Sequence, residues 1–167
     1  MTTAPSPARS AAVLVVSTRA SAGVYADETG PIIRAWLAER GFAVGDPVIV
    51  ADASVAEAIA TALAGAPDLL LTTGGTGLSP DDRTPEATAA VLDREIPGLM
   101  EELRRRGLAA TPMALLTRGV AGVAGRTVVM NLPGSRGGVR DGLAVLDPIL
   151  DHLLAQLGGR GDHERTP

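Results

Sequence analysis

The sequence contains no cysteine and no lysine, and these two absences exclude several kinds of chemistry. Without cysteine, disulfides, thiolate zinc sites and cysteine nucleophiles are all excluded. Without lysine, the chain has no Schiff-base residue and no P-loop lysine for a nucleotide phosphate. Only two histidines occur, His152 and His163, both near the C-terminus. A histidine-based triad or metal site is therefore not expected.

Aromatic residues are also scarce, at 2% of the 167 residues, so the core must consist of Val, Leu, Ile and Ala. So few rings provide no stacking platform for single-stranded nucleic acid, and a net charge of −4 opposes nucleic-acid binding. The early apolar run, Val13–Val16, is too short for a signal peptide or a membrane span. We expect a cytoplasmic protein that binds neither nucleic acid nor membrane.

Hydrophobic residues make up 46% of the chain, which is enough for one domain with a sizeable core. We interpret residues 11–157 as that domain, and residues 1–10 and 158–167, where small and polar side chains dominate, as disordered tails. An Arg-Gly-Asp triplet in the second tail resembles an integrin ligand, but nothing else indicates an extracellular protein.

Strands and helices alternate along most of the chain, which is typical of an α/β fold. Apolar runs and helical periodicity predict strands at 11–17, 44–50, 68–72, 113–120 and 127–131, and helices that begin near positions 31, 54, 84, 97 and 135. The last two strands are too close for a helical crossover and must be antiparallel. The sequence thus predicts a three-layer α/β/α sandwich with a mostly parallel sheet and one antiparallel strand.

Three side chains are expected to cap helix N-termini. Ser54 begins a capping-box pattern, and Thr84 stands before a proline at the first helical position. Asp147 precedes Pro148, which is expected to split the last helix. We therefore expect Asp147 to cap the second half of that helix.

Open α/β sheets bind ligands beyond the carboxyl ends of their strands. Hydroxyls, glycines and acids follow four of the predicted strands, which suggests one shared site at this edge. The segments concerned are Ser17–Ser21, Asp52, Gly74–Gly77 and Asn131–Ser135.

The turn Gly74-Gly75-Thr76-Gly77 directly follows a predicted buried strand. Glycine allows positive φ and lets an anion approach backbone N–H groups closely, and Thr72, Thr73 and Thr76 add hydroxyl donors. A tight turn in which glycine only relieves strain is the simpler explanation, but the whole TTGGTG pattern favours phosphate binding. The pattern is neither a Rossmann fingerprint nor a Walker loop, because Pro80 replaces the third glycine and no Gly-Lys pair follows.

Asp81 and Asp82 follow this turn, and carboxylates beside a phosphate are unfavourable unless a cation lies between them. Mg²⁺ takes oxygen ligands and bridges to phosphates, and Asp52 at a neighbouring strand end could complete its site. Each acid alone is equally well explained as a loop or capping residue. Together with the glycine turn, the three acids favour a metal site.

Ser135 stands where the helix after Asn131-Leu132-Pro133-Gly134 is expected to begin. The free N–H groups and partial positive charge of a helix N-terminus offer a second anion site, although an ordinary cap explains the serine equally. Arg136 and Arg140 either add charge for a phosphate or are solvated, and the sequence favours neither.

The segment TTGGTGLSPDDRTPEAT resembles the signature of the MogA and MoaB family of molybdenum cofactor biosynthesis proteins. STRASAGVYADETGP, REIPG and NLPGS match the same family in kind and order. The resemblance covers about residues 11 to 157, and the GGTG form favours this branch over the related MoeA-type and CinA-type domains.

The resemblance implies a Mg²⁺-dependent transfer of AMP from ATP to the terminal phosphate of molybdopterin, with release of pyrophosphate. It places the catalytic, metal-binding aspartates at Asp52 and Asp82, and it implies a homotrimer or hexamer that could hand its product to a MoeA-type molybdenum insertase. The residues predicted to bind substrate or phosphate are Ser17, Thr73, Gly74, Gly75, Thr76, Gly77, Asn131, Pro133, Gly134 and Ser135.

Three positions depart from the family pattern. Thr18 stands where many members have Asp, Gly107 where some have a Ser in the substrate pocket, and Arg136-Gly137 where Pro-Lys is common. These departures favour an alternative, a MoaB-type protein that carries molybdopterin without turnover, whereas retention of Asp52 and Asp82 favours the enzyme. A phosphate-binding domain with an unrelated substrate would require the motif match to be accidental.

Overall fold

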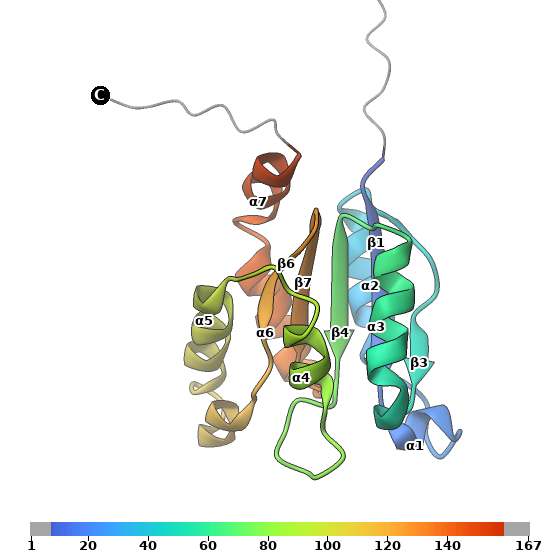
Figure 1. Ribbon diagram of the computed structural model, residues 1–167. Helices are drawn as coiled ribbons and strands as arrows, with labels where there is room; N and C mark the ends of the chain where they lie inside the picture. Colours follow the sequence, from blue (N-terminus) through green and yellow to red (C-terminus); the bar gives the residue numbers. More distant parts are fainter. Residues whose placement is uncertain (1–7, 159–167) are drawn as a thin grey trace, which may run out of the picture.

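Seven strands form one twisted sheet in the computed structural model, which describes residues 8–158 of the chain (Figure 1). The strand order is β2-β1-β4-β7-β6-β5, and β3 pairs with β1 beside β2. Only β6 runs against its neighbours among these strands, so the predicted parallel sheet with one antiparallel strand is confirmed. The strands are β1 Ser10–Val16, β2 Ala43–Val44, β3 Val48–Val50, β4 Leu69–Thr73, β5 Arg94–Glu95, β6 Ala121–Ala124 and β7 Thr127–Leu132.

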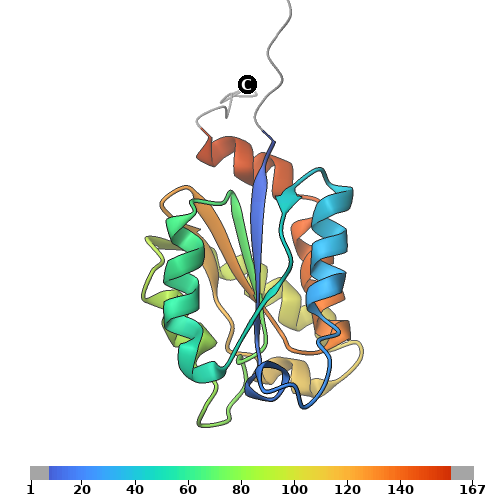
Figure 2. The ribbon, with the colours of Figure 1, turned by 90° about the vertical axis from the view of Figure 1, so that its right-hand side faces the viewer.

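Helices cover both faces of the sheet and give the predicted three layers. Figure 2 shows α2 and α3 on opposite sides of β1, because alternate residues of each buried strand face opposite layers. The helices are α1 Thr18–Ser21, α2 Gly30–Glu39, α3 Val55–Ala64, α4 Thr84–Ala89, α5 Pro97–Gly107, α6 Arg136–Leu146 and α7 Leu150–Leu157, with 3₁₀ turns η1 Asp52–Ser54 and η2 Pro112–Leu116.

Two apolar clusters separate the layers. On one face, Leu71 and Met130 pack with α2, α5, α6 and α7, and on the other, Leu70 and Val129 pack with Ile59 of α3. All of these strand residues are fully buried, and the clusters consist almost wholly of aliphatic side chains, as the composition requires. The continuous apolar strands thus explain why neither face of the sheet is left open.

The division of the chain into one domain and two tails stays a prediction. The strand β1 begins at Ser10, one residue earlier than predicted. Most of the two predicted tails, and the Arg-Gly-Asp triplet, lie outside the described residues. Between residues 8 and 158, no helix combines the length and the hydropathy needed to cross a membrane.

Two predicted strands are wrong, because no residue of 113–120 lies in a strand and the segment 44–50 is interrupted. The segment 113–120 begins as the 3₁₀ turn η2, because Pro112 favours a helical start and the Thr111 hydroxyl accepts a hydrogen bond from the Met113 N–H. Its apolar side chains are exposed, and an apolar run alone does not distinguish a buried strand from a turn. The segment 44–50 is split into β2 and β3 by Gly45-Asp46-Pro47, where proline cannot donate a ladder hydrogen bond.

The predicted caps at Ser54, Thr84 and Asp147 are also wrong. Ser54 makes no capping bond because the turn η1 already precedes α3, and Thr84 lies inside α4 rather than before it. Asp147 instead ends α6, where the Arg40 guanidinium donates to it at 2.6 Å and lowers its pKa. Only Ser135 acts as expected, since its hydroxyl accepts from the Gly138 N–H at 3.1 Å.

Candidate functional site

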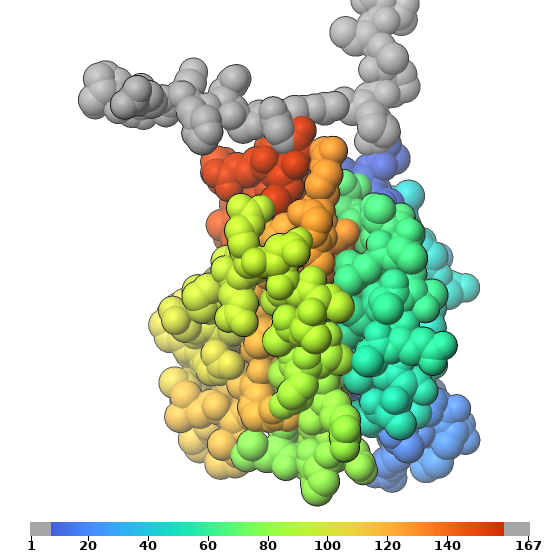
Figure 3. Space-filling view, in the orientation of Figure 1, coloured from blue at the N-terminus to red at the C-terminus, as the bar shows by residue number. Residues whose placement is uncertain are grey.

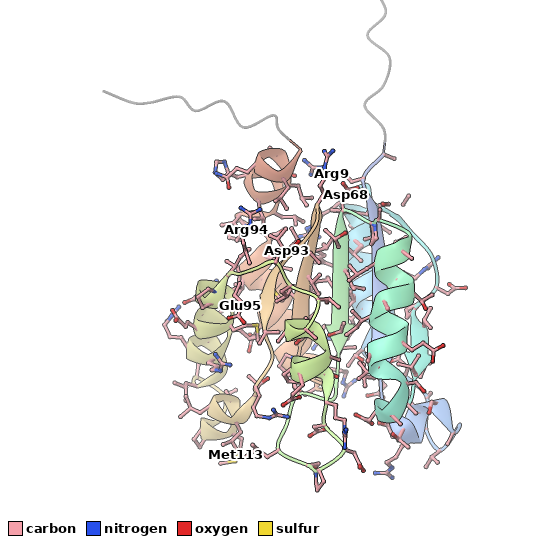
Figure 4. The ribbon with its side chains drawn as sticks, viewed as in Figure 1. Arg9, Asp68, Asp93, Arg94, Glu95 and Met113 are labelled. Atoms are coloured by element: carbon pink, nitrogen blue, oxygen red, sulfur yellow. The ribbon has the colours of Figure 1, made fainter. Side chains whose placement is uncertain are left out.

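The four predicted segments meet in one cavity of about 520 Å³ at the carboxyl ends of β1, β3, β4 and β7. In Figure 1 this is the lower end of the sheet, and Figure 3 shows the loop between β4 and α4 projecting from it. Figure 4 places Asp68 and Arg9 at the opposite end of the molecule. The four segments therefore lie together at one sheet edge, while ligand binding there stays a prediction. Its lining includes Ser17, Thr18, Asp52, Gly75, Asp82 and Ser135.

The glycine turn has the backbone conformation that its sequence predicts. Gly74 and Gly75 adopt φ values of +90° and +65°, which L side chains rarely adopt. A Cβ on Gly74 would lie 2.2 Å from the Val16 carbonyl oxygen, and one on Gly75 would lie 2.3 Å from the Thr84 Oγ1. Glycine is therefore required at both positions by conformation and by close packing.

The turn also leaves backbone donors available for an anion. The Gly74 N–H donates to the Leu132 carbonyl at 3.1 Å, so this group is already used. No acceptor among residues 8–158 takes a backbone hydrogen bond from Gly75, Thr76 or Gly77. Gly75 lines the cavity, whereas Thr76 and Gly77 do not. A phosphate in the cavity would thus meet Gly75 first.

Asp52 is oriented by Thr18, one of the residues that depart from the family pattern. Its Oδ2 accepts from the Thr18 Oγ1 at 2.8 Å and from the Thr18 N–H at 3.2 Å. The Thr18 Oγ1 in turn accepts from the Asp52 N–H at 3.2 Å. These bonds leave the other carboxylate oxygen, Oδ1, 3.0 Å from the position that a Cβ on Gly75 would occupy. Thr18 therefore supports Asp52 at this edge instead of adding a further charge.

Asp82 reaches the same cavity from the loop after β4. Its Oδ2 accepts from the Ser79 N–H at 3.1 Å, and its own N–H donates to the Ser79 carbonyl at 2.9 Å. Asp81 also lines the cavity. Within the part of the chain that the structure describes, however, no three acidic or histidine side chains group closely enough to enclose a metal ion. Any bound cation would need further oxygen ligands from a substrate.

Thr84, which the sequence suggested only as a cap, is a further candidate for this site. Its side chain is fully buried, and its Oγ1 has no hydrogen-bond partner among the described residues. The Oγ1 and the Asp52 Oδ1 face the same small space over Gly75. A buried hydroxyl without a partner is costly. Thr84 does not line the cavity, so a ligand would reach this oxygen only through the space over Gly75.

Ser17 and Thr73 line the cavity and are already hydrogen-bonded. The Ser17 hydroxyl lies 2.8 Å from the Tyr25 hydroxyl and accepts from the Ala20 N–H at 3.1 Å. The Thr73 Oγ1 donates to the Pro133 carbonyl at 2.8 Å, which joins the glycine turn to the NLPG loop. Gly134 and Ser135 complete this side of the cavity.

Asn131 lies behind the cavity rather than in it. Its Oδ1 accepts from the Val120 N–H at 3.0 Å, and its Nδ2 donates to the Thr72 and Thr88 hydroxyls at 2.9 Å each. The side chain is fully buried and does not line the cavity. Direct contact between Asn131 and a substrate stays a prediction, while its internal hydrogen bonds link β4, β7 and α4.

A smaller, mostly apolar cavity of about 270 Å³, the side cavity, shares Ser135 with the main one. Gly107 and Met113 line it, and Figure 4 shows Met113 at the lower end of the molecule. A Cβ on Gly107 would lie 2.6 Å from the Ala114 Cβ. A larger residue at position 107 would therefore collide with Ala114 unless one of the two segments moved.

The arginines of the last long helix divide between two places. Arg136 lines the main cavity and lies 3.6 Å from Glu28, with both side chains largely exposed. Arg140 lies instead in a depression beside Trp36. Of the two candidates, only Arg136 is near the site.

Comparison with known proteins agrees with this geometry. A family model described as a probable molybdopterin binding domain matches residues 12–152. A molybdenum cofactor biosynthesis bifunctional protein of Synechococcus elongatus is 42% identical over 92% of this chain and 48% of its own length. A molybdopterin adenylyltransferase of Haemophilus influenzae is 40% identical over 77% of this chain and 68% of its own. The Mog protein structure from Mycobacterium ulcerans is 54% identical over 90% of this chain and 99% of that chain, with a TM-score of 0.86.

The fold and the cavity define an α/β domain with a glycine turn and two aspartates at one sheet edge. The chain belongs to the molybdopterin-binding domain family, in its MogA and MoaB branch of molybdenum cofactor biosynthesis proteins. It spans about half the length of the bifunctional relatives that it matches.

Proposed function

We propose that this chain is a molybdopterin adenylyltransferase, which transfers AMP from ATP to the terminal phosphate of molybdopterin and releases pyrophosphate. The observation that carries the proposal is that one cavity unites the glycine turn, Asp52, Asp82 and the helix N-terminus at Ser135. Backbone N–H groups and a helix N-terminus bind phosphates, and two carboxylates beside them suit a reaction between two anionic substrates in the presence of a cation.

The reaction requires positioning more than covalent chemistry. An oxygen of the terminal phosphate of molybdopterin attacks the α-phosphorus of ATP, a new phosphorus–oxygen bond forms, and the bond to the bridging oxygen of pyrophosphate breaks. In this proposal Gly75 and Ser135 hold phosphate oxygens, and Ser17 orients the substrate. No covalent enzyme intermediate is needed, in keeping with a chain that lacks cysteine. Catalysis then depends on proximity and on charge stabilisation.

The residues present fit Mg²⁺. This ion is usually held by one or two carboxylates together with waters and substrate phosphates, and Asp52 and Asp82 provide that number. The Thr84 Oγ1 without a partner supplies another neutral oxygen beside the Asp52 Oδ1. When bound, Mg²⁺ would neutralise charge on the triphosphate.

Release of pyrophosphate tests the proposal directly. Wild type and Asp82→Ala would be incubated with ATP and Mg²⁺, with and without molybdopterin. We expect release that depends on molybdopterin in the wild type and is lost in the variant, because one metal-binding carboxylate is removed. Absence of release, with tight molybdopterin binding by both proteins, would instead support a carrier. The altered side cavity around Gly107 is the observation that favours this second candidate.

The other properties implied by the family also stay proposals. We propose a homotrimer or hexamer, a cytoplasmic location and hand-over of the product to a MoeA-type molybdenum insertase. Exposed apolar side chains of η2 support self-association, since Met113, Leu115 and Leu116 are 61%, 57% and 47% exposed.

Two buried threonines of α4 offer a matched test of the role of Thr84. Thr84→Val removes a hydroxyl that has no partner among the described residues, so the free energy of unfolding should change by less than about 0.5 kcal/mol. The rate of pyrophosphate release should fall by roughly tenfold, because a ligand contact is lost. Thr88→Val removes a bond to the Thr84 carbonyl and an acceptor for Asn131, and should cost about 1–3 kcal/mol.

Urea unfolding and initial rates of pyrophosphate release would measure the two effects. If Thr84→Val kept wild-type turnover, its hydroxyl would have no role at the site.

A further inference from the structure

Arg118 lies opposite the loop that carries Asp82, in the segment between η2 and β6. Its Nε donates to the Gly77 carbonyl at 2.8 Å, and its Nη2 donates to the Asp82 carbonyl at 3.0 Å. Its Nη1 donates to the Glu86 carboxylate, and its backbone N–H donates to the Thr76 carbonyl at 2.8 Å. One residue therefore binds the backbone at both ends of the loop, although it lies more than 30 positions away in sequence.

The loop itself has little other support. Leu78 is 66% exposed, and residues 79–81 are exposed as well. Among the residues that the structure describes, the side chain of Asp82 is hydrogen-bonded only to the Ser79 N–H, which lies within the same loop. Local bonds of this kind set the shape of the loop, but they do not fix its position relative to Asp52. The hydrogen bonds from Arg118 connect the loop to the segment between η2 and β6.

We infer that Arg118 is a positioning residue, which holds the backbone of Asp82 so that its carboxylate faces Asp52 across the cavity. This inference rests on the proposed function, because the distance between the two carboxylates matters only if they act on a common ligand. Arg118 itself does not line the main cavity. It therefore acts through Asp82 and not on the substrate.

The chemistry of arginine fits this role better than a simple surface ion pair does. A guanidinium is planar and presents several N–H groups in a fixed fork, so it binds three separate oxygens at once. The Arg118 hydrogen bond lowers the pKa of Glu86, so that carboxylate is ionised at neutral pH and balances the charge. The Glu86 side chain is 58% exposed, and an ion pair that exposed contributes little stability. The two backbone carbonyls are the more informative partners.

Four variants test the inference: Arg118→Lys, Arg118→Gln, Glu86→Gln and the control Arg40→Gln. Arg40 is a matched control because its side chain is 28% exposed, against 34% for Arg118, and it also binds a carbonyl and a carboxylate, but on another face. We expect Arg118→Gln to lower kcat by about tenfold or more, since a displacement of 1 Å can cost on the order of 100-fold. The kcat of Arg118→Lys should lie between those of the wild type and Arg118→Gln, because lysine keeps the positive charge but lacks the planar set of N–H donors.

Two further measurements separate positioning from a general loss of structure. The Mg²⁺ concentration for half-maximal rate should rise in Arg118→Gln and stay unchanged in Arg40→Gln, with a much smaller change in KM for molybdopterin. Hydrogen exchange of the backbone amides in the loop 78–83, where Pro80 has none, should be faster in Arg118→Gln without any ligand. Glu86→Gln should give a weaker version of each effect, because the carbonyl bonds remain.

Unchanged kcat and Mg²⁺ dependence in Arg118→Gln would overturn the inference, even if exchange were faster. Unchanged exchange would overturn it equally. If the wild type released no pyrophosphate, the proposed function would fail. Exchange at 78–83 and the affinity for ATP with Mg²⁺ would then decide the role of Arg118 separately. If Arg118→Gln did not fold, Arg118→Lys would give the same comparison with the charge retained.

Discussion

Asp52→Asn is expected to lower kcat for pyrophosphate release by on the order of 100-fold or more, with the fold intact. Asparagine has nearly the same shape, and its carbonyl oxygen can still accept the bonds from the Thr18 N–H and hydroxyl. The substitution removes only the negative charge beside Gly75, where a cation would bind. A neutral amide is a far poorer ligand for Mg²⁺ than a carboxylate. Steady-state kinetics across a Mg²⁺ titration would measure the loss.

Asp68→Asn is a matched control for this substitution. The Asp68 Oδ2 accepts from a backbone N–H, that of Ser10, at 2.8 Å, but at the opposite end of the sheet (Figure 4). Wild-type turnover is expected for Asp68→Asn. Wild-type kcat and Mg²⁺ dependence in Asp52→Asn would show that Asp52 only shapes the strand end.

Gly74→Ala is expected to have the largest effect on stability, a loss of about 2–4 kcal/mol in the free energy of unfolding. The left-handed backbone conformation alone costs an L residue about 1–2 kcal/mol. The new Cβ would in addition lie 2.2 Å from the Val16 carbonyl oxygen, a backbone atom of the central strand that cannot move aside without shifting β1. Urea unfolding with an unchanged m-value would measure the difference.

Gly41→Ala separates the two causes. Gly41 has φ +78°, close to that of Gly74, but a Cβ there would have no neighbour within 4 Å. It should therefore show only the conformational cost, about 1–2 kcal/mol. Equal losses in the two variants would mean that the packing of the turn against β1 contributes nothing.

The site was largely predictable because parallel strands bring their carboxyl ends together whatever their order in the sheet. Asp52 and Gly74 follow different strands, and each comes directly after an apolar run in the sequence. The fold class followed from the same alternation. The antiparallel direction of the late hairpin was predictable as well, because its connection is too short for a crossover, although its first strand was predicted at 113–120 and lies at Ala121–Ala124.

The features that the sequence did not predict depend on contacts between distant residues. Arg118 lies inside the segment 113–120, which resembles a strand in sequence, and its partners lie more than 30 residues earlier. Thr84 matches the pattern of a cap, and only the packing of Gly75 against it shows that its hydroxyl faces the site. The role of Thr18 depends on Asp52, 34 residues away. Local patterns contain no information on such pairs.

The buried amide of Asn131 sets the alignment of the two central strands. Thr72 and Asn131 are directly paired residues of β4 and β7, and their side chains are hydrogen-bonded at 2.9 Å. A slip of one residue would turn Asn131 to the opposite face of the sheet and leave its amide buried without partners. This pairing also fixes the glycine turn after β4 beside the NLPG loop after β7, so an insertion or deletion within either strand would separate the two halves of the site.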